Sequence, residues 1–298
     1  MIAYPKISPD ILSVGPITLR WYGMMYVIGF VFGFHILKAR IRAGFMKVSL
    51  EYADTYITYV VLGMLLGARL VYVFVYNWPH YSENPGEILA VWSGGLSFHG
   101  AALGMMLASW LYARNYKVNF LSVLDTLAIA SPIGLFVGRI GNFINAELYG
   151  RASDVPWAMV FPTDPLQIPR HPSQLYQALT EGALLLLILC LSHKRLLKAK
   201  KLKNGMLAAI FVGAYGVLRF FTEFTRQPDA QFADDPNSLG TVLGPFSMGQ
   251  VLCFIMIVIS IFQWRYVQRT QSLVSPRPLG GEGPAPNFLE RWMARIAT

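Results

Sequence analysis

Long runs of hydrophobic residues, separated by short polar segments, cover most of this chain of 298 residues. A run of about 20 apolar residues is long enough to cross the hydrocarbon core of a bilayer as a helix. The runs predict seven membrane-spanning helices, over residues 18–37, 53–76, 96–113, 120–143, 173–192, 205–224 and 247–264. We therefore expect an all-α, polytopic membrane protein in which residues 1–270 form a single seven-helix domain.

The composition supports a membrane protein without metal or cofactor chemistry. Hydrophobic residues make up 54% of the chain and charged residues only 14%, whereas about 25% of a soluble domain is charged. Cys190 and Cys253 both fall inside apolar runs, which argues against a disulfide framework or a cysteine-based metal site. The first ten residues contain Asp10 and two prolines, so we expect the first apolar run to be a span rather than a cleavable signal peptide.

The distribution of Lys and Arg predicts the orientation of the helices. Seventeen of the 25 basic residues lie between spans 1 and 2, 3 and 4, 5 and 6, or after span 7, and five lie on the other side. Because cytoplasmic loops carry an excess of Lys and Arg, we expect a periplasmic N-terminus and a cytoplasmic C-terminus. The net charge of +9 is then a signal of topology rather than of nucleic-acid binding.

The tail, residues 271–298, differs in composition from the rest of the chain. Its first half is rich in proline and glycine, which is typical of a flexible linker. In its second half Phe288, Leu289, Trp292, Met293 and Ile296 recur at helical spacing opposite Arg291 and Arg295. This pattern fits a short amphipathic helix at the cytoplasmic membrane surface, and a frayed terminus is the alternative.

Polar residues recur near the outer ends of six predicted spans. Arg69, Arg139 and Arg219 lie inside spans 2, 4 and 6, and Tyr215, Arg219 and Glu223 share one helical face. Charged side chains are costly inside a bilayer and are usually functional there. We therefore predict one cavity that opens toward the outer leaflet. Since the planar donor fork of arginine suits phosphate, the expected occupant is a phospholipid headgroup.

Structural roles compete with these assignments. Arg219 with Glu223, and Arg139 with Glu147, could be salt bridges that only support the fold, and Arg69 is the arginine best placed to be structural. His99 begins span 3 and is either a hydrogen-bonded structural residue or the proton acceptor of the site, because a neutral imidazole accepts protons near pH 7. His171 and Tyr22 are weaker candidates, since either could be an interfacial anchor.

Residues Gly138 to Gly150, at the end of span 4, read GRIGNFINAELYG. This stretch resembles the signature of bacterial prolipoprotein diacylglyceryl transferases, G-R-x-G/A-N-F-x-N-x-E-x-x-G, at every fixed position. Six further blocks also resemble this family, in the same order: 21–23, 67–69, 94–100, 170–176, 215–219 and 223–229. Ala101 departs from the family pattern, in which a second glycine often follows His-Gly. The tail after about Thr270 lies outside the resemblance.

The resemblance implies an enzyme of the bacterial inner membrane that catalyses the first step of lipoprotein maturation. The expected reaction transfers the diacylglyceryl group of phosphatidylglycerol to the lipobox cysteine of a prolipoprotein, and glycerol phosphate leaves. The partners are then phosphatidylglycerol, the lipobox segment and membrane lipids. The segment from Ala152 to Pro169 is short for the family, which predicts a small periplasmic cap.

The resemblance also implies roles for individual residues, with the active site toward the periplasmic leaflet. The catalytic candidates are His99, Arg139, Arg219 and Tyr22. The residues expected to bind the substrate, besides Arg139, are Asn142, Asn145, Glu147, Gly150, Tyr215, Glu223 and His171. Among these, Gly150 would permit a tight turn beneath the headgroup, and Asn142 and Glu147 would orient Arg139 or the glycerol.

Two rival functions have specific predictions of their own. A lipid or anion transporter would use the arginines as a transient binding site, but the sequence has neither the internal repeats nor the interrupted midplane helices typical of transporters. An intramembrane hydrolase would use Ser97 with His99, but no nucleophile-elbow pattern surrounds Ser97.

Overall fold

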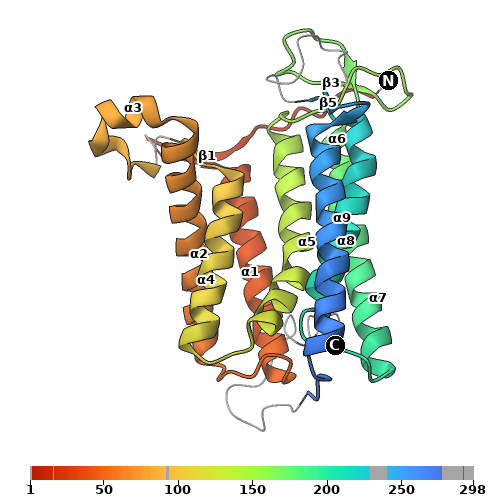
Figure 1. Ribbon diagram of the computed structural model, residues 1–298. Coiled ribbons are helices and arrows are strands. Elements are labelled where there is room, and N and C mark those ends of the chain that lie inside the picture. The colour runs from red at the N-terminus through yellow and green to blue at the C-terminus, as the bar shows by residue number, and fades with distance from the viewer. Residues whose placement is uncertain (1, 16, 92–93, 229–239, 277–290, 292–298) are drawn as a thin grey trace.

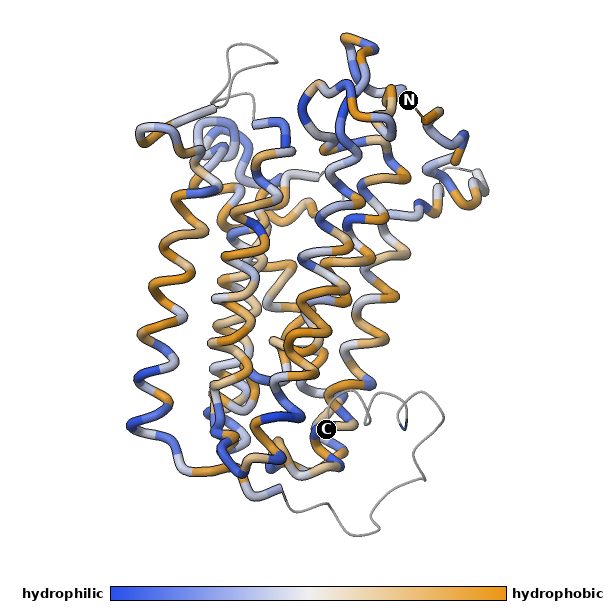
Figure 2. The backbone as a smooth tube through the Cα atoms, turned by 90° about the vertical axis from the view of Figure 1, so that its right-hand side faces the viewer, coloured by the Kyte–Doolittle hydropathy of each residue, from blue (hydrophilic) through white to orange (hydrophobic). Residues whose placement is uncertain are grey.

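Long helices stand side by side in the computed structural model, which describes residues 2–15, 17–91, 94–228, 240–276 and 291 (Figure 1). Short strands and loops gather at one end of the bundle, together with the short helix α3 (Trp78–Glu83). We call this the cap end, and the other end the opposite end. Figure 2 shows hydrophobic residues along the middle of the helices and hydrophilic residues toward both ends.

The helices follow the predicted spans closely. They are α1 (Trp21–Arg42), α2 (Tyr52–Val71) with the π-helix η1 (Tyr72–Tyr76), α4 (Phe98–Asn115), α5 (Phe120–Ile144), α6 (Ser173–Gln177) with η4 (Ala178–Leu184) and α7 (Leu185–Lys198), α8 (Met206–Thr222) with η5 (Glu223–Thr225), and α9 (Met248–Thr270). A 3-10 turn, η2 (Pro85–Glu87), follows α3.

Three short antiparallel strand pairs complete the described fold. They are β1 (Asp10–Val14) with β2 (Ile17–Arg20), β3 (Met159–Val160) with β4 (Pro169–Arg170), and β5 (Thr241–Leu243) with β6 (Phe246–Ser247). The pair β3–β4 lies between α5 and α6, in the segment 151–172 that we call the cap. In this pair Met159 lies opposite Arg170. The expected all-α fold is confirmed, with these strands confined to the connections.

Six helical segments of the described residues are long and apolar enough to cross a membrane. They correspond to six of the seven predicted spans. The helix α4 forms where a seventh span is predicted, but its 18 residues are not apolar enough to count by the same measure. The reason is its composition, in which glycine, serine, His99 and Arg114 replace bulky apolar residues.

The helices α2 and α4 pack with their backbones in close contact. Gly63 and Gly67 on α2 face Gly100 and Gly104 on α4, and a methyl group added at Gly104 would lie 3.0 Å from the Cα atom of Gly67 and closer to the carbonyl of Gly63. Each pair is spaced by four residues, so its two members share one helical face. Small residues at this spacing let membrane helices approach closely.

The helix α5 contacts both halves of the bundle. On one side it packs against α1, and on the other against η4 and α8. Gly182 of η4 is so close to Phe136 of α5 that an added methyl group would lie 2.6 Å from the phenylalanine Cβ atom. This close approach brings one face of η4 against the half of α5 that carries the signature.

The opposite end is held together by polar contacts between connections. Asp125 of α5 accepts hydrogen bonds from the backbone N–H groups of Gly205 and Ala208, at 2.8 and 2.9 Å, and so caps the start of α8. After α9 the backbone N–H of Val274 donates to Leu202, and Leu273 pairs with Lys203. The segment 271–274 therefore packs on the bundle, so a linker would begin later than residue 271. The amphipathic helix predicted around 288–296 lies outside the described residues, apart from Arg291.

We predict that Gly104→Ala destabilises the protein, because the added methyl group would push α4 away from α2. Overpacking of this kind costs about 1–3 kcal/mol. The measurement is the midpoint of thermal unfolding in detergent, followed with a thiol-reactive dye that labels the buried Cys253. Gly134→Ala on α5 is the matched control, because its methyl group would meet no atom within 4 Å. Equal midpoints for the two variants would contradict the predicted clash.

Candidate active site

Two arginines from different helices meet on one buried carboxylate. The Arg139 Nη2 atom of α5 lies 3.7 Å from Glu181 Oε2, and the Arg219 Nη1 atom of α8 lies 3.5 Å from Glu181 Oε1. The side chain of Glu181 is fully buried, while those of Arg139 and Arg219 are 19% and 10% exposed. The structure thus brings together the two arginines predicted to bind an anion, and Glu181 is the residue that joins them.

Arg219 also pairs with Glu223, one helical turn further along the chain. Its Nη2 atom lies 2.6 Å from Glu223 Oε2, and Ser247 Oγ donates a hydrogen bond of 3.2 Å to Glu223 Oε1. Ser247 caps the start of α9, and Gly249 follows so closely that a methyl group there would touch the Glu223 carboxylate. The carboxylate therefore lies at a helix N-terminus, where negative charge is favourable.

Arg151, in the cap, contributes a third positive charge near this pair. Burial lowers the pKa of the Arg151 guanidinium, and the neighbouring Glu223 carboxylate opposes that shift. Arg151 is joined to the segment after α8 through its backbone N–H, which donates to the Thr225 carbonyl at 3.0 Å. Arg151 thus lies close to Glu223, the carboxylate that pairs with Arg219.

The signature residues form a compact turn at the end of α5. The chain reverses through Ala146, whose φ of 54° is left-handed, and the Glu147 N–H returns to the Asn142 carbonyl at 3.0 Å. This is the hydrogen-bond pattern of a Schellman helix end. It lets Glu147 Oε1 accept hydrogen bonds from Asn142 Nδ2 at 2.8 Å and Asn145 Nδ2 at 3.3 Å. Glu147 is therefore engaged by the two asparagines, and Arg139 pairs with Glu181.

A stripe of polar residues on α6 and η4 faces this turn. Gln174 Nε2 donates to the Glu147 carbonyl at 2.7 Å, and Gln177 and Glu181 follow along the same helix. Gln177 is 1% exposed, and neither its amide nitrogen nor its amide oxygen has a hydrogen-bond partner in the described protein. Because buried polar groups are normally hydrogen-bonded, the unsatisfied amide marks a place suited to a polar ligand.

Gly150 lies where three segments of the chain meet. Its N–H donates to the His171 carbonyl at 2.8 Å, and it pairs with Arg226 across an isolated β-bridge. A methyl group at this position would lie 2.7 Å from the His171 Cβ atom. Gly150 therefore provides close backbone contact, whereas the left-handed conformations of the turn fall on Ala146 and Leu148. The expected tight turn is thus placed a few residues earlier.

His171 belongs to the cap rather than to the arginine cluster. Its Nδ1 atom lies 3.2 Å from the Tyr176 hydroxyl, which also accepts a hydrogen bond of 2.6 Å from Trp157 Nε1. Burial lowers the pKa of His171 below its usual value, and Asp154 opposes the shift. The contacts of His171 are those of a residue that anchors the cap.

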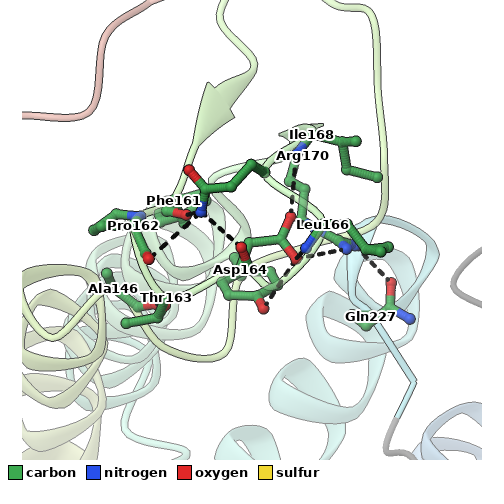
Figure 3. A network of polar contacts seen from close by, with 11 residues as sticks. Ala146, Phe161, Pro162, Thr163, Asp164, Leu166, Ile168, Arg170 and Gln227 are labelled. Carbon is green, nitrogen blue, oxygen red and sulfur yellow. Dashed lines mark hydrogen bonds and ion pairs between the residues drawn. The ribbon is translucent and has the colours of Figure 1, made fainter.

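An ion pair at the centre of the cap holds the loop from Phe161 to Arg170 (Figure 3). Arg170 donates two hydrogen bonds to Asp164, at 2.6 and 3.0 Å, and a third to Gln227 at 3.3 Å. Burial alone would raise the pKa of Asp164, but the hydrogen bonds from Arg170 and from the Leu166 and Ile168 N–H groups lower it. Thr163 Oγ1 donates to the Ala146 carbonyl, which ties this loop to the end of the signature turn.

The two tyrosines predicted at the site lie on α1 and α8. Tyr22 of α1 lies against the signature, because a methyl group at Gly141 would come 3.3 Å from its ring, and its hydroxyl is 3.1 Å from that of Tyr26. Tyr215 lies one turn before Arg219 on α8 and packs among the apolar residues of the core with Phe211.

His99 is found at a different place from the arginines. It is exposed in the first turn of α4, and its Nδ1 atom lies 3.4 Å from the Tyr76 hydroxyl at the end of η1. Ser97 caps α4 by accepting a hydrogen bond from the Gly100 N–H at 3.2 Å. A serine used as a helix cap is not directed at His99, which argues against the hydrolase.

Arg69 does not join the other two arginines. Its guanidinium donates to the backbone carbonyls of Glu87, Ile88, Gly94 and Gly95, at 2.6–3.2 Å, and lies over the ring of Tyr81. The expectation of three converging arginines is therefore wrong, and two converge. The structural role is the better description of Arg69, because its hydrogen-bond partners are backbone carbonyls.

The sequence interpretation assigned no individual role to Glu181, Gln177 or Arg151. Gln174, Gln177 and Glu181 do show a signal, because they lie along one side of the fifth span. An acidic residue near the middle of an apolar run needs a partner, and two arginines were available. The interpretation paired these arginines only with acidic residues nearby in the sequence.

Fold and site together define a multi-pass helical membrane protein that buries a cluster of opposite charges inside one end of its bundle. Residues 9–266 match the prolipoprotein diacylglyceryl transferase family. The phosphatidylglycerol–prolipoprotein diacylglyceryl transferase of Azotobacter vinelandii is 45% identical over 270 residues, which cover 89% of this chain and 97% of that protein. Proteins of the same name from Ectopseudomonas mendocina and Azospirillum brasilense are each 44% identical, over 91% and 88% of this chain and 98% and 94% of those proteins.

This chain belongs to the prolipoprotein diacylglyceryl transferase family. The resemblance carried by Gly138 to Gly150 is thereby confirmed, and the protein is a transferase.

Proposed function

We propose that this protein transfers the diacylglyceryl group of phosphatidylglycerol to the lipobox cysteine of a prolipoprotein. The observation that carries the proposal is the convergence of Arg139 and Arg219 on Glu181, with the signature turn directly beside it. Those two guanidinium groups come from separate helices and are largely withdrawn from water. The relatives that match this chain are named for the same donor and the same acceptor.

The unused donors of the cluster suit a phosphodiester. Arg219 Nη1 is buried without a hydrogen-bond partner in the described protein, and the planar donor fork of a guanidinium group matches the oxygens of a phosphate. Within the described residues the Arg139 guanidinium group makes no hydrogen bond and approaches Glu181 only to 3.7 Å, which leaves its donors free to bind phosphate oxygens.

The reaction is a displacement at the carbon of the diacylglyceryl group that is bonded to the phosphate oxygen. The cysteine thiol loses its proton, the thiolate forms a C–S bond, and the C–O bond to the phosphate breaks. Deprotonation of a free thiol with pKa about 8.5 costs about 2 kcal/mol at pH 7. The leaving glycerol phosphate gains negative charge, which Arg139 and Arg219 stabilise because their donors are already in place in a site of low polarity.

The other residues are assigned by their positions. Asn142, Asn145 and Glu147 form the hydrogen-bonded turn next to Arg139 and are placed to contact the glycerol headgroup. Tyr22 and Tyr215 form walls, while Gly150 and His171 fix the cap above the site. We assign His99 as the general base, although in the structure its neighbour is Tyr76, so the acceptor thiol would have to bind between His99 and the arginines.

We place the site toward the periplasmic leaflet of the bacterial inner membrane. The segments 43–51, 116–119 and 199–205 join helices at the end opposite the cap and carry five lysines, and further basic residues lie in the helix ends next to them. By the positive-inside rule that end is cytoplasmic, so the cap, the signature turn and the arginines lie on the outer side. Translocated prolipoproteins present their lipobox cysteine on that side.

The transfer itself is tested in vesicles that contain the purified protein and phosphatidylglycerol with labelled acyl chains. With a lipobox peptide we expect label on the peptide and release of one glycerol phosphate per thioether formed. A peptide with serine in place of the lipobox cysteine is the control and should stay unlabelled, because a hydroxyl is far less acidic than a thiol. Label that crosses the bilayer on unchanged lipid, with none on the peptide, would indicate a transporter instead.

Arg219→Lys should reduce kcat about 100-fold or more, the usual loss when one donor to a developing oxyanion is removed. Lysine keeps the positive charge but cannot contact Glu181, Glu223 and a phosphate at once, as a planar guanidinium can. Arg20→Lys is the matched control, since Arg20 is exposed and pairs only with Asp10 at 3.2 Å in the described contacts. Normal turnover of Arg219→Lys would show that Arg219 merely balances Glu223.

His99→Gln should reduce kcat about 100-fold, within the usual contribution of a general base, and change the dependence of the rate on pH. Glutamine keeps a polar contact with Tyr76 but cannot accept the proton. His80→Gln is the control, because His80 is exposed and pairs with Glu87 at 3.0 Å. Near-normal turnover with an unchanged pH profile would exclude the base role of His99.

A further inference from the structure

Glu181 lies in an unusual piece of helix. The fifth span changes from α-helix to π-helix over Ala178–Leu184, and Glu181 is the middle residue of that segment. Single π-turns within helices occur often at functional sites, because they rotate side chains away from the ordinary α-helical face. Gly182 lets this turn pack directly on Phe136 of α5, three residues before Arg139.

The contacts of Glu181 aim it between the two arginines. Thr222 Oγ1 donates a hydrogen bond of 2.9 Å to Glu181 Oε1, which is also the oxygen nearest Arg219. The other oxygen, Oε2, faces Arg139. Glu181 Oε1 thus faces Arg219 and Oε2 faces Arg139. The hydrogen bond from Thr222 to Oε1 holds the carboxylate in this orientation.

The ion pairs made by Glu181 are longer than ordinary hydrogen bonds. At 3.5 and 3.7 Å they lack hydrogen-bond geometry, and Glu181 Oε2 and Arg219 Nη1 are buried without a hydrogen-bond partner in the described protein. A pair that served only to stabilise the fold would be expected to close to ordinary hydrogen-bond length, as Arg170 and Asp164 do at 2.6 Å. Glu181 instead holds both guanidinium groups near it without forming a hydrogen bond to either, so Arg219 Nη1 and the Arg139 donors stay unused.

We propose that Glu181 is a positioning residue that sets the spacing of Arg139 and Arg219 for the phosphate of the lipid. The inference rests on the proposed function and adds a residue to which the sequence assigned no role. Without a carboxylate between them, two like charges would repel and move apart in a medium that screens them poorly. With it, both can direct donors to one phosphate group while Arg219 remains bound to Glu223.

The test compares three variants by kcat and KM for phosphatidylglycerol. Glu181→Gln keeps the shape and a hydrogen bond to Thr222 but loses the charge. We expect kcat to fall about 100-fold, as for misplacement of reacting groups by about 1 Å, and KM to change by less than about threefold, since the positive charge that attracts the phosphate is retained. Glu181→Asp, with a carboxylate that reaches less far, should recover part of the lost kcat.

Thr222→Val tests the same role of Glu181. Glu181→Gln removes the carboxylate between two buried arginines and so threatens folding, whereas Thr222→Val leaves all three charges in place. It removes the hydrogen bond that aims Glu181 and should lower kcat with little change in KM. The matched control is Thr180→Val, a neighbour on the π-helix whose hydroxyl donates only to the Tyr176 carbonyl at 2.8 Å in the described contacts. We expect its kinetics to be those of the unmodified protein.

A second readout does not depend on turnover. Phenylglyoxal modifies accessible guanidinium groups, and mass spectrometry gives the rate at each arginine. Release of Arg139 from Glu181 should raise its modification rate in Glu181→Gln, while Arg170, held by Asp164 in the cap, serves as the internal reference.

The outcomes separate the two proposals. Normal kcat in folded Glu181→Gln, or a rise in KM alone, would overturn the positioning role, as would an unchanged modification rate at Arg139. If the unmodified protein transfers no lipid, the proposed function fails, whereas the modification rates still decide whether Glu181 holds Arg139.

Discussion

The site depends on a single constraint: two guanidinium groups must share one carboxylate inside an apolar bundle. Isolated charges are strongly disfavoured in such surroundings, so Arg139, Arg219 and Glu181 require one another. Their meeting fixes the rotation of α5, η4 and α8 about their axes. Glu223 and the start of α9 extend the same constraint to a fourth helix through Ser247.

Glycine makes this arrangement possible at several points, always by allowing one backbone to approach another element. Gly182 admits Phe136 beside the arginines, and Gly150 joins the signature turn to the cap. At Gly104 the same property unites α2 and α4, far from the charged cluster. Because an added methyl group at these positions would clash with the neighbouring element, the glycines allow these close approaches.

Two polar groups at the cap end have different structural purposes. Around Arg69 the donors are satisfied by backbone carbonyls, which fixes the connection between α3 and α4. Around Arg139 and Arg219 several buried polar atoms of the described protein are left without hydrogen bonds, among them those of Gln177. The hydrogen bonds around Arg69 are therefore satisfied within the protein. The unsatisfied polar atoms around Arg139 and Arg219 are typical of a binding site. His99 belongs to the α2–α4 side, so a reaction that uses it would join both halves of the bundle.

The length of the hydrophobic runs and the positions of Lys and Arg are properties of the sequence alone. They were sufficient to predict six confirmed helices and to argue an orientation. They also identified Arg139 and Arg219 as charged residues inside spans. The spacing of Asn142 and Glu147 likewise follows from one helix end. The tertiary structure alone decided that Glu181 joins the arginines, that Arg69 binds carbonyls and that His99 lies beside Tyr76. These contacts join residues 23 to 42 positions apart. They depend on how each helix is rotated and on where a π-turn shifts its face, which hydropathy does not record.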